Sequence, residues 1–220
     1  MGRRRWWHRI ADRDRDAVDF QGTKWFVAAG EKNYTKSTGQ REIKHIVIHI
    51  TGGPAMDESS SVNEFRGSSK SSSHYIVNRR GEITQMVREA DIAHHAHSGN
   101  ANSIGIEHVN PYMRRKKKRP TEKQYRASAE LVAYLCLKYK IHPSRSHSVS
   151  QSGIIGHMDV DTDTGHQDCP NEDAWDWGKY LEYVSSIYYN RLIKSWKELV
   201  DDIRHTSEIS KQPRRLFSYH

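Results

Sequence analysis

The chain has 220 residues, of which 35% are hydrophobic and 28% are charged, which fits one domain of ordinary size with terminal extensions. The formal net charge of +8 favours an anionic partner, such as nucleic acid, a membrane surface or a cell-wall polymer, without choosing among them. The two cysteines do not suggest a disulfide framework, and no apolar run approaches the roughly 18 residues of a membrane span.

The first part of the chain predicts an extension followed by a region rich in strands. Residues 1–40 are charged and weakly periodic, and their charged start lacks the apolar core of a classical secretion signal. Short apolar runs then predict strands over residues 43–50, 74–78, 82–87 and 104–109. Residues 79–81 predict a hairpin turn between the second and third strands, and residues 62–65 fit a short helix in a Ser-rich loop.

Two helical patterns occupy the second half of the chain. Thr121 and Gln124 have the spacing of a capping box, and apolar residues then recur at helical spacing until Pro143 ends the helix. A second helical pattern runs from about residue 177 to 203, as one helix or as two.

The order of these elements predicts the fold class and the domain boundaries. Strands interleaved with helices indicate an α/β or α+β domain with a largely buried sheet. We assign residues 1–40 to an N-terminal extension, residues 41–190 to the catalytic domain, and residues 191–220 to a C-terminal helical extension and tail. Cys136 falls inside the first predicted helix, so we expect it to be a small core residue.

Three residues stand in contexts that suit a metal ligand. His49 ends an apolar strand-like run, His157 follows a second short apolar run, and Cys169 precedes a proline in a polar loop. Two imidazoles and one thiolate leave the fourth position of a tetrahedral zinc open, as in a catalytic site. Because the chain has 14 histidines, any single one is more often a surface or core residue. The prediction therefore depends on the whole set and its order.

Six short motifs support this set by resemblance to a known family. They are V-I-H-I-T-G-G at 47–53, S-H-Y-I-V at 73–77 with Gly81, D-I-A-H-H-A at 91–96, Asn100 with S-I-G-I-E at 103–107, G-H-M-D at 156–159, and C-P at 169–170. In this order they resemble the zinc-dependent N-acetylmuramoyl-L-alanine amidases of type 2. That superfamily also includes the peptidoglycan recognition proteins and a phage lysozyme type. The resemblance covers roughly residues 33 to 180.

The resemblance implies a fold and a set of residue roles. The fold would be α/β, with a central mixed β-sheet flanked by helices. One zinc ion per chain would be held by His49, His157 and Cys169, and Glu107 would carry a proton from the attacking water to the departing amine. His95 would bind substrate or orient the site, and the asparagine of the S-I-G-I-E signature would shape the loop before the strand of Glu107.

One departure from the family pattern concerns a tyrosine. Some members use a Tyr directly before the hairpin histidine as a catalytic partner, but this chain has Ser73 at that position. Tyr75 lies on the other side of the histidine and therefore does not inherit the role. Glu107 is present instead, as in the branch of the family in which this glutamate is the acid/base.

A second departure leaves the third ligand open. Members often carry Lys two residues before it, where this chain has Gln167 if Cys169 is the ligand and His166 if Asp168 is. Either residue is a candidate partner for the oxyanion of the tetrahedral intermediate. We favour Cys169 because a proline follows it directly and a thiolate suits zinc.

The predicted reaction is hydrolysis of the amide between N-acetylmuramic acid and L-alanine in peptidoglycan or a muropeptide. A binding-only recognition protein would lose metal ligands, whereas competent residues occupy all three positions here. The basic run at residues 114–119 could bind phosphates, but no nucleic-acid motif accompanies it, so we expect a solvated loop or attraction to envelope polymers. We further expect a monomer, made in the cytosol, that acts on the cell wall after release or non-classical export.

Overall fold

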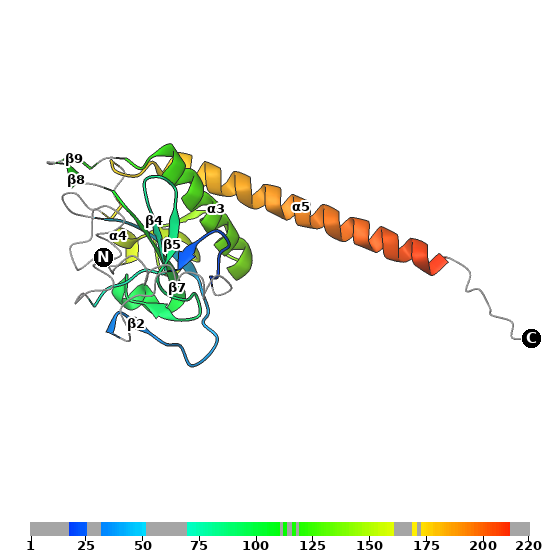
Figure 1. Cartoon of the computed structure of the whole chain (residues 1–220), viewed down its shortest axis with the longest axis horizontal. Coiled ribbons are helices and arrows are strands. Elements are labelled where there is room, and N and C mark those ends of the chain that lie inside the picture. Colours follow the sequence, from blue (N-terminus) through cyan, green and yellow to red (C-terminus); the bar gives the residue numbers. More distant parts are fainter. Residues whose placement is uncertain are drawn as a thin grey trace, which may run out of the picture.

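A mixed β-sheet lies at the centre of the protein, shown in Figure 1 as a computed structural model. The structure describes residues 18–25, 32–51, 70–110, 112–113, 116–117, 119–160, 169–170 and 173–211. Within these residues the sheet has seven strands, in the order β1-β5-β4-β7-β3-β11-β10. They are β1 (Lys24–Trp25), β3 (His45–Ile50), β4 (Tyr75–Val77), β5 (Ile83–Gln85), β7 (Ser103–His108), β10 (Arg145–Ser146) and β11 (Gly153–Gly156).

Helices and two small strand pairs complete the described fold. The strand pairs are β2 (Tyr34–Thr35) with β6 (Ile92–Ala93), and β8 (Tyr112–Met113) with β9 (Lys116–Lys117). The helices are the 3₁₀ helix η3 (His97–Asn102), α3 (Glu122–Tyr139), α4 (His157–Val160) and α5 (Trp177–Lys211). The central strand β3 is parallel to β7 and β11, whereas β4 and β5 run antiparallel to each other. The prediction of a central mixed sheet flanked by helices is confirmed.

The four predicted strands form, with slightly different ends, as β3, β4, β5 and β7. The predicted hairpin turn joins β4 to β5, and Gly81 in it has a φ of 83°. A side chain there would be strained, and its Cβ would lie 2.8 Å from the carbonyl oxygen of Lys123, so the turn requires glycine. The predicted short helix at residues 62–65 lies outside the described residues.

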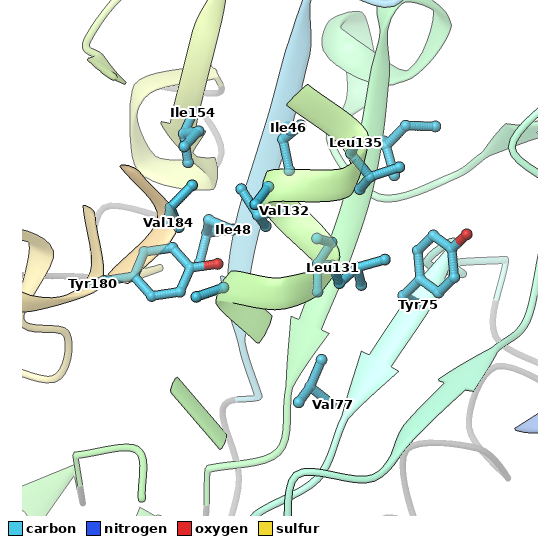
Figure 2. Close-up of a cluster of buried hydrophobic side chains, with 14 of the residues drawn as sticks. Ile46, Ile48, Tyr75, Val77, Leu131, Val132, Leu135, Ile154, Tyr180 and Val184 are labelled. Atoms are coloured by element: carbon cyan, nitrogen blue, oxygen red, sulfur yellow. The ribbon is translucent and has the colours of Figure 1, made fainter. Parts of the chain in front are cut away.

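The two faces of β3 have different neighbours, which positions the candidate site. All six residues of the strand are buried, as in a parallel sheet covered on both faces. Ile46, Ile48 and Ile50 point to one face and pack against α3 and α5 in the main core, part of which Figure 2 shows. Because successive side chains alternate, His45, Val47 and His49 point to the opposite face.

Helix α3 covers the core face and begins as the sequence predicts. The Thr121 side chain accepts a hydrogen bond from the backbone N–H of Gln124 at 3.2 Å. Only this half of the expected capping box forms, because the Gln124 side chain donates instead to the carbonyl oxygens of Val77 and Val109. Those two bonds tie the helix to the ends of β4 and β7. Cys136 is fully buried in the same core, as expected.

The segments before and after the central sheet also contribute to the fold. Strand β1 extends the sheet by pairing with β5, and the Asp19 backbone N–H donates to the Gln85 side chain at 2.8 Å. Part of residues 1–40 therefore belongs to the sheet. Helix α5 runs without a break through residue 190 and extends far from the sheet (Figure 1). Among the described helices, none combines the length and apolarity that crossing a membrane requires.

Candidate metal centre and active site

The three predicted metal ligands come together at one end of the sheet. One ligand atom each from His49, His157 and Cys169 lies within 4.8 Å of the other two. The topology explains the first two positions. Strands β3 and β11 are parallel neighbours in which Ile48 faces Gly156, so the residue that follows each of them emerges beside the other. The two imidazole rings have centroids 4.5 Å apart.

A largely but not fully buried ion pair holds the turn that carries His157. Asp159 accepts a hydrogen bond from the Gly156 backbone N–H at 3.2 Å and pairs with Arg145, whose side chain is nearly buried. The Arg145 guanidinium also lies 3.9 Å from the ring centre of Trp177. The aspartate of the G-H-M-D motif thus fixes the turn between β11 and α4, which sets the direction of the His157 side chain.

Backbone contacts position Cys169 next to the other two ligands. Its carbonyl oxygen accepts from the Met158 backbone N–H at 2.9 Å. Its sulfur lies 3.4 Å from the Ile50 backbone nitrogen, which donates to it, and 4.0 Å from His49 Nδ1. Asp168, His166 and Gln167 lie outside the described residues.

A chain of hydrogen bonds determines which nitrogen of His49 faces the site. The Ser103 hydroxyl donates to the carbonyl oxygen of Gly99 at 2.6 Å, so Ser103 Oγ can accept from His95 Nε2, 3.2 Å away. In neutral His95 the Nδ1 atom is then an acceptor, and it lies 3.0 Å from His49 Nε2. His49 therefore carries its proton on Nε2, which leaves Nδ1 unprotonated toward Cys169.

The surroundings of His95 favour its neutral form and pack closely against its ring. Burial, and then the neighbouring His74, hold the pKa of His95 well below its usual range. The ring lies directly over Gly105, where a Cβ atom would be only 2.5 Å from His95 Cγ. The glycine of the S-I-G-I-E motif thus makes room for the histidine. Asn100 shapes the loop, as expected, because its side-chain oxygen accepts from the backbone N–H groups of His95 and Ala96.

Arg41 organises the same loop, and the sequence analysis missed it. Its guanidinium donates to carbonyl oxygens on both sides of the loop, including those of Glu89 at 2.8 Å, Asn100 at 3.0 Å and Ser103 at 2.7 Å. Nothing in the sequence distinguishes Arg41 from the other basic residues, because its partners are backbone atoms far along the chain. These carbonyl oxygens come close enough to share one guanidinium only in the folded loop.

Glu107 shares the face of the sheet on which His49 lies. The two residues are register partners on the parallel strands β7 and β3, so their side chains project from the same side of strands that lie about 4.8 Å apart. Tyr75 points to the opposite face, where it is fully buried and its hydroxyl donates to Glu89. Burial and Glu89 raise the pKa of Tyr75, and the sheet separates its hydroxyl from the three ligands.

The donor set fits a zinc ion. Imidazole nitrogen and thiolate sulfur are the atoms that zinc binds in proteins, and three protein ligands are typical of catalytic sites. The neighbouring His95 satisfies the other nitrogen of His49, as histidine ligands usually require. Among the described residues, this is the group of histidine, cysteine and acidic side chains whose ligand atoms converge closely enough to hold a metal.

A curated protein matches part of this chain. N-acetylmuramoyl-L-alanine amidase A of Achromobacter lyticus is 37% identical over 94 residues, which are 42% of this chain and 50% of that protein. The chain thus spans about half the length of this curated relative.

Solved structures of low sequence identity share the fold. The hydrolase AmiA of Staphylococcus aureus, crystallised with its ligand, superposes with a TM-score of 0.63 at 14% identity, over 84% of this chain and 93% of that one. The endolysin N-acetylmuramoyl-L-alanine amidase LysCS of Clostridium intestinale gives 0.50 at 19% identity, over 73% and 91%. Residues 39–172 match the N-acetylmuramoyl-L-alanine amidase family, and the chain belongs to this family.

Proposed function

We propose that the protein is a zinc-dependent N-acetylmuramoyl-L-alanine amidase that cleaves the amide between N-acetylmuramic acid and L-alanine of peptidoglycan. The observation that carries this proposal is the convergence of His49, His157 and Cys169 within 4.8 Å in a chain of the amidase family. The names of the curated relative and of the endolysin structure support the same substrate class.

The three ligands would hold zinc and leave room for the substrate. His49 would bind through Nδ1, since its Nε2 is engaged by His95. When bound, zinc supplies Lewis acidity, which activates water and polarises the scissile carbonyl. The chain's contribution is to fix the ligand orientation, and the Asp159 and Ser103 hydrogen bonds support that role for His157 and for the His95–His49 pair.

Glu107 would carry the proton. Amide hydrolysis requires that the attacking water lose a proton and that the departing amine gain one, because an amide anion is a very poor leaving group. Glu107 lies on the strand next to His49 and on the same face of the sheet, so its carboxylate is available to both steps. Tyr75 is buried on the other face and takes no part.

His95 would orient the first ligand. A substrate-binding role and an orienting role were both expected for this residue. The hydrogen bond from His49 Nε2 to His95 Nδ1 at 3.0 Å, and the ring's tight seat over Gly105, favour the orienting role.

Digestion of purified murein sacculi and of soluble anhydro-muropeptides, followed by mass analysis, tests the proposed function. We expect intact stem peptides with a free L-alanine amino group, stoichiometric zinc in the protein, and loss of both activity and zinc in His157→Ala. Release of disaccharide units with the stem still attached, or full turnover in zinc-free protein, would contradict the proposal. The two substrates also separate a wall-degrading enzyme, which we propose, from one that processes soluble fragments.

A further inference from the structure

Three buried polar side chains, which we call the core network, connect the two core helices to strand β3. They are Tyr180 of α5, Ser128 of α3 and His108 of β7, and each is fully buried. Figure 2 shows the Tyr180 hydroxyl directed toward α3, where its oxygen lies 2.7 Å from Ser128 Oγ. Ser128 Oγ lies 2.7 Å from His108 Nε2, and His108 Nδ1 lies 2.8 Å from the carbonyl oxygen of His49. The network therefore reaches the first proposed ligand from the core side of the sheet.

The partners at each step fix the direction of the hydrogen bonds. A carbonyl oxygen only accepts, so His108 Nδ1 carries a proton and donates to His49. Burial lowers the pKa of His108 to about 4, so the ring is neutral at neutral pH and its Nε2 is an acceptor. The Ser128 hydroxyl then donates to Nε2 and accepts from Tyr180. Each group of the core network thus donates toward His49.

The peptide group between His49 and Ile50 carries this polarity across β3. The C=O and N–H of a trans peptide group point in opposite directions. On one side the carbonyl of His49 accepts from His108, and on the other the N–H of Ile50 donates to Cys169 Sγ at 3.4 Å. Resonance couples the two ends, because a hydrogen bond accepted by the oxygen draws electron density from the nitrogen. The series of hydrogen bonds therefore ends on the third proposed ligand.

The sulfur of Cys169 occupies a position beside β3 that suits an anion. Strand β11 ends at Gly156, the register partner of Ile48, and the sulfur takes the N–H of Ile50, two residues farther along β3. The sulfur also lies 3.6 Å from the carbonyl oxygen of Ile50, to which a thiol can donate. Cysteine binds zinc as a thiolate, which only accepts, so the N–H of Ile50 then serves as its donor. A hydrogen bond to a charged acceptor is stronger than one to a neutral acceptor.

Aromatic packing encloses the core network. Trp175 is fully buried, and its ring packs edge-to-face against His108, with centroids 4.6 Å apart, and against Tyr180 at 4.8 Å. Away from solvent each hydrogen bond is stronger, and successive bonds polarise one another. Tyr125 packs against the same Trp175 at 4.9 Å, but its hydroxyl accepts from the backbone N–H of Asp176 at 2.8 Å. Tyr125 therefore shares the packing of the core network without taking part in its hydrogen bonds.

We propose that the core network positions the Cys169 sulfur and strengthens its binding to zinc through the peptide group of His49 and Ile50. Tyr180, Ser128 and His108 are then positioning residues of the metal centre, although none of them touches the metal. The inference rests on the proposed zinc site. It adds that α3 and α5 act on the metal centre through hydrogen bonds as well as through packing.

Zinc affinity of the folded protein, measured by chelator competition without substrate, tests the proposal. His108→Leu removes the donor to His49 and keeps an apolar side chain in the core, so zinc affinity should fall by about 10- to 100-fold. His108→Asn restores an N–H donor near the position of Nδ1 and should recover much of that loss, although it packs less well against Trp175. Ser128→Ala should weaken zinc binding in the same direction, by less than His108→Leu.

The absorption spectrum of the Co²⁺-substituted protein gives a readout that a loss of folding stability does not move. Charge transfer from a thiolate to Co²⁺ produces a band, and its absence in Cys169→Ala would assign it to this sulfur. Because the N–H of Ile50 withdraws electron density from the sulfur, His108→Leu should shift the band to longer wavelength. Tyr125→Phe, the matched control, should keep both the band and the zinc affinity of the wild type.

Several outcomes would overturn the proposal. A His108→Leu protein that is folded by circular dichroism and has the zinc affinity and Co²⁺ band of the wild type is one. Equal losses in His108→Leu and His108→Asn, or the same loss in Tyr125→Phe, would assign the effect to packing around Trp175 instead of to the hydrogen bonds. A wild-type protein that binds no zinc would overturn the proposed function as well, whereas the other outcomes leave that function standing.

Discussion

Among single residues, Glu107 allows the proposed proton transfer to be tested separately from metal binding. Its side chain is not among the three converging ligands, although it shares a face of the sheet with His49. Glu107→Gln should therefore keep the fold and most of the zinc, while the turnover falls by roughly 10² to 10⁴, the usual effect of losing a positioned acid/base. Zinc content and the rate of muropeptide cleavage, measured on the same preparation, check this.

Tyr75→Phe is the matched control for Glu107→Gln. It removes the hydroxyl that donates to the buried Glu89, so it should lower the free energy of unfolding by about 1 to 3 kcal/mol while leaving turnover nearly unchanged. A zinc-loaded Glu107→Gln protein with wild-type turnover, beside an inactive and well-folded Tyr75→Phe, would instead favour the tyrosine branch of the family.

The identity of the third ligand is also decided by single residues. Cys169 has its sulfur beside His49 Nδ1, and thiolate binds zinc strongly. We therefore expect Cys169→Ala to lose zinc during dialysis against a chelator, and Asp168→Asn to retain it. The reverse order would make Asp168 the ligand, and His166 rather than Gln167 would then be the neighbour expected to stabilise the oxyanion.

At the scale of elements, strand β7 and the loop before it form one unit with His49, the first of the proposed zinc ligands. Gly105 of β7 supports the ring of His95, whose Nδ1 accepts a hydrogen bond from His49 Nε2. Gly105→Ala would bring a Cβ atom within 2.5 Å of that ring, so His95 must move. We expect the zinc affinity to fall by about 10- to 100-fold, as when other partners of metal-bound histidines are lost.

Chelator competition measures that loss of zinc affinity. Gly39→Ala is the control, because a Cβ there meets nothing within 4 Å. Circular dichroism of both variants shows whether the overall secondary structure is kept. Unchanged zinc affinity in a folded Gly105→Ala protein would mean that His95 does not orient His49.

For the whole molecule, a buried histidine makes stability depend on pH. His74 accepts from the Gly105 backbone N–H at 3.0 Å, so its Nε2 carries the proton and donates to the carbonyl oxygen of Asp91. Burial, and then Arg41, lower the pKa of His74 from 6.5 to about 3. Between these two pH values the unfolded chain takes up a proton that the folded chain does not. The contribution of neutral His74 to stability is therefore fully present above pH 6.5 and is lost as the pH falls from 6.5 toward 3.

His74→Asn should reduce this acid sensitivity. The amide oxygen of the variant can still accept from Gly105 but does not titrate. Between pH 6 and pH 4, the free energy of unfolding should therefore fall less steeply in the variant than in the wild type, by up to about 1.4 kcal/mol per pH unit. Urea unfolding in the presence of a chelator, which keeps metal binding out of the comparison, measures the difference. The buried His108, whose pKa is lowered to about 4, leaves part of the slope in the variant. Identical slopes in both proteins would rule out His74 as a source of it.

Local patterns in the sequence were enough to predict the framework of the site. A short run of consecutive apolar residues, such as 46–48, is typical of a strand buried on both faces, so His49 directly after it could be predicted to lie at the edge of a buried sheet. The capping Thr121 and the hairpin glycine are likewise read from neighbours within a few residues. The candidate ligands and Glu107 were identified differently, by the resemblance of six motifs, in order along the chain, to a known family.

Only the tertiary structure determined how these residues cooperate. The proton on His49 depends on Gly99, Ser103 and His95, and the loop between them depends on Arg41, whose partners lie up to 62 residues away. The sequence predicted the helix of α5 but not that its second half leaves the domain with large apolar side chains exposed. Both outcomes arise from contacts between segments distant along the chain, and residue spacing within a segment carries no information about them.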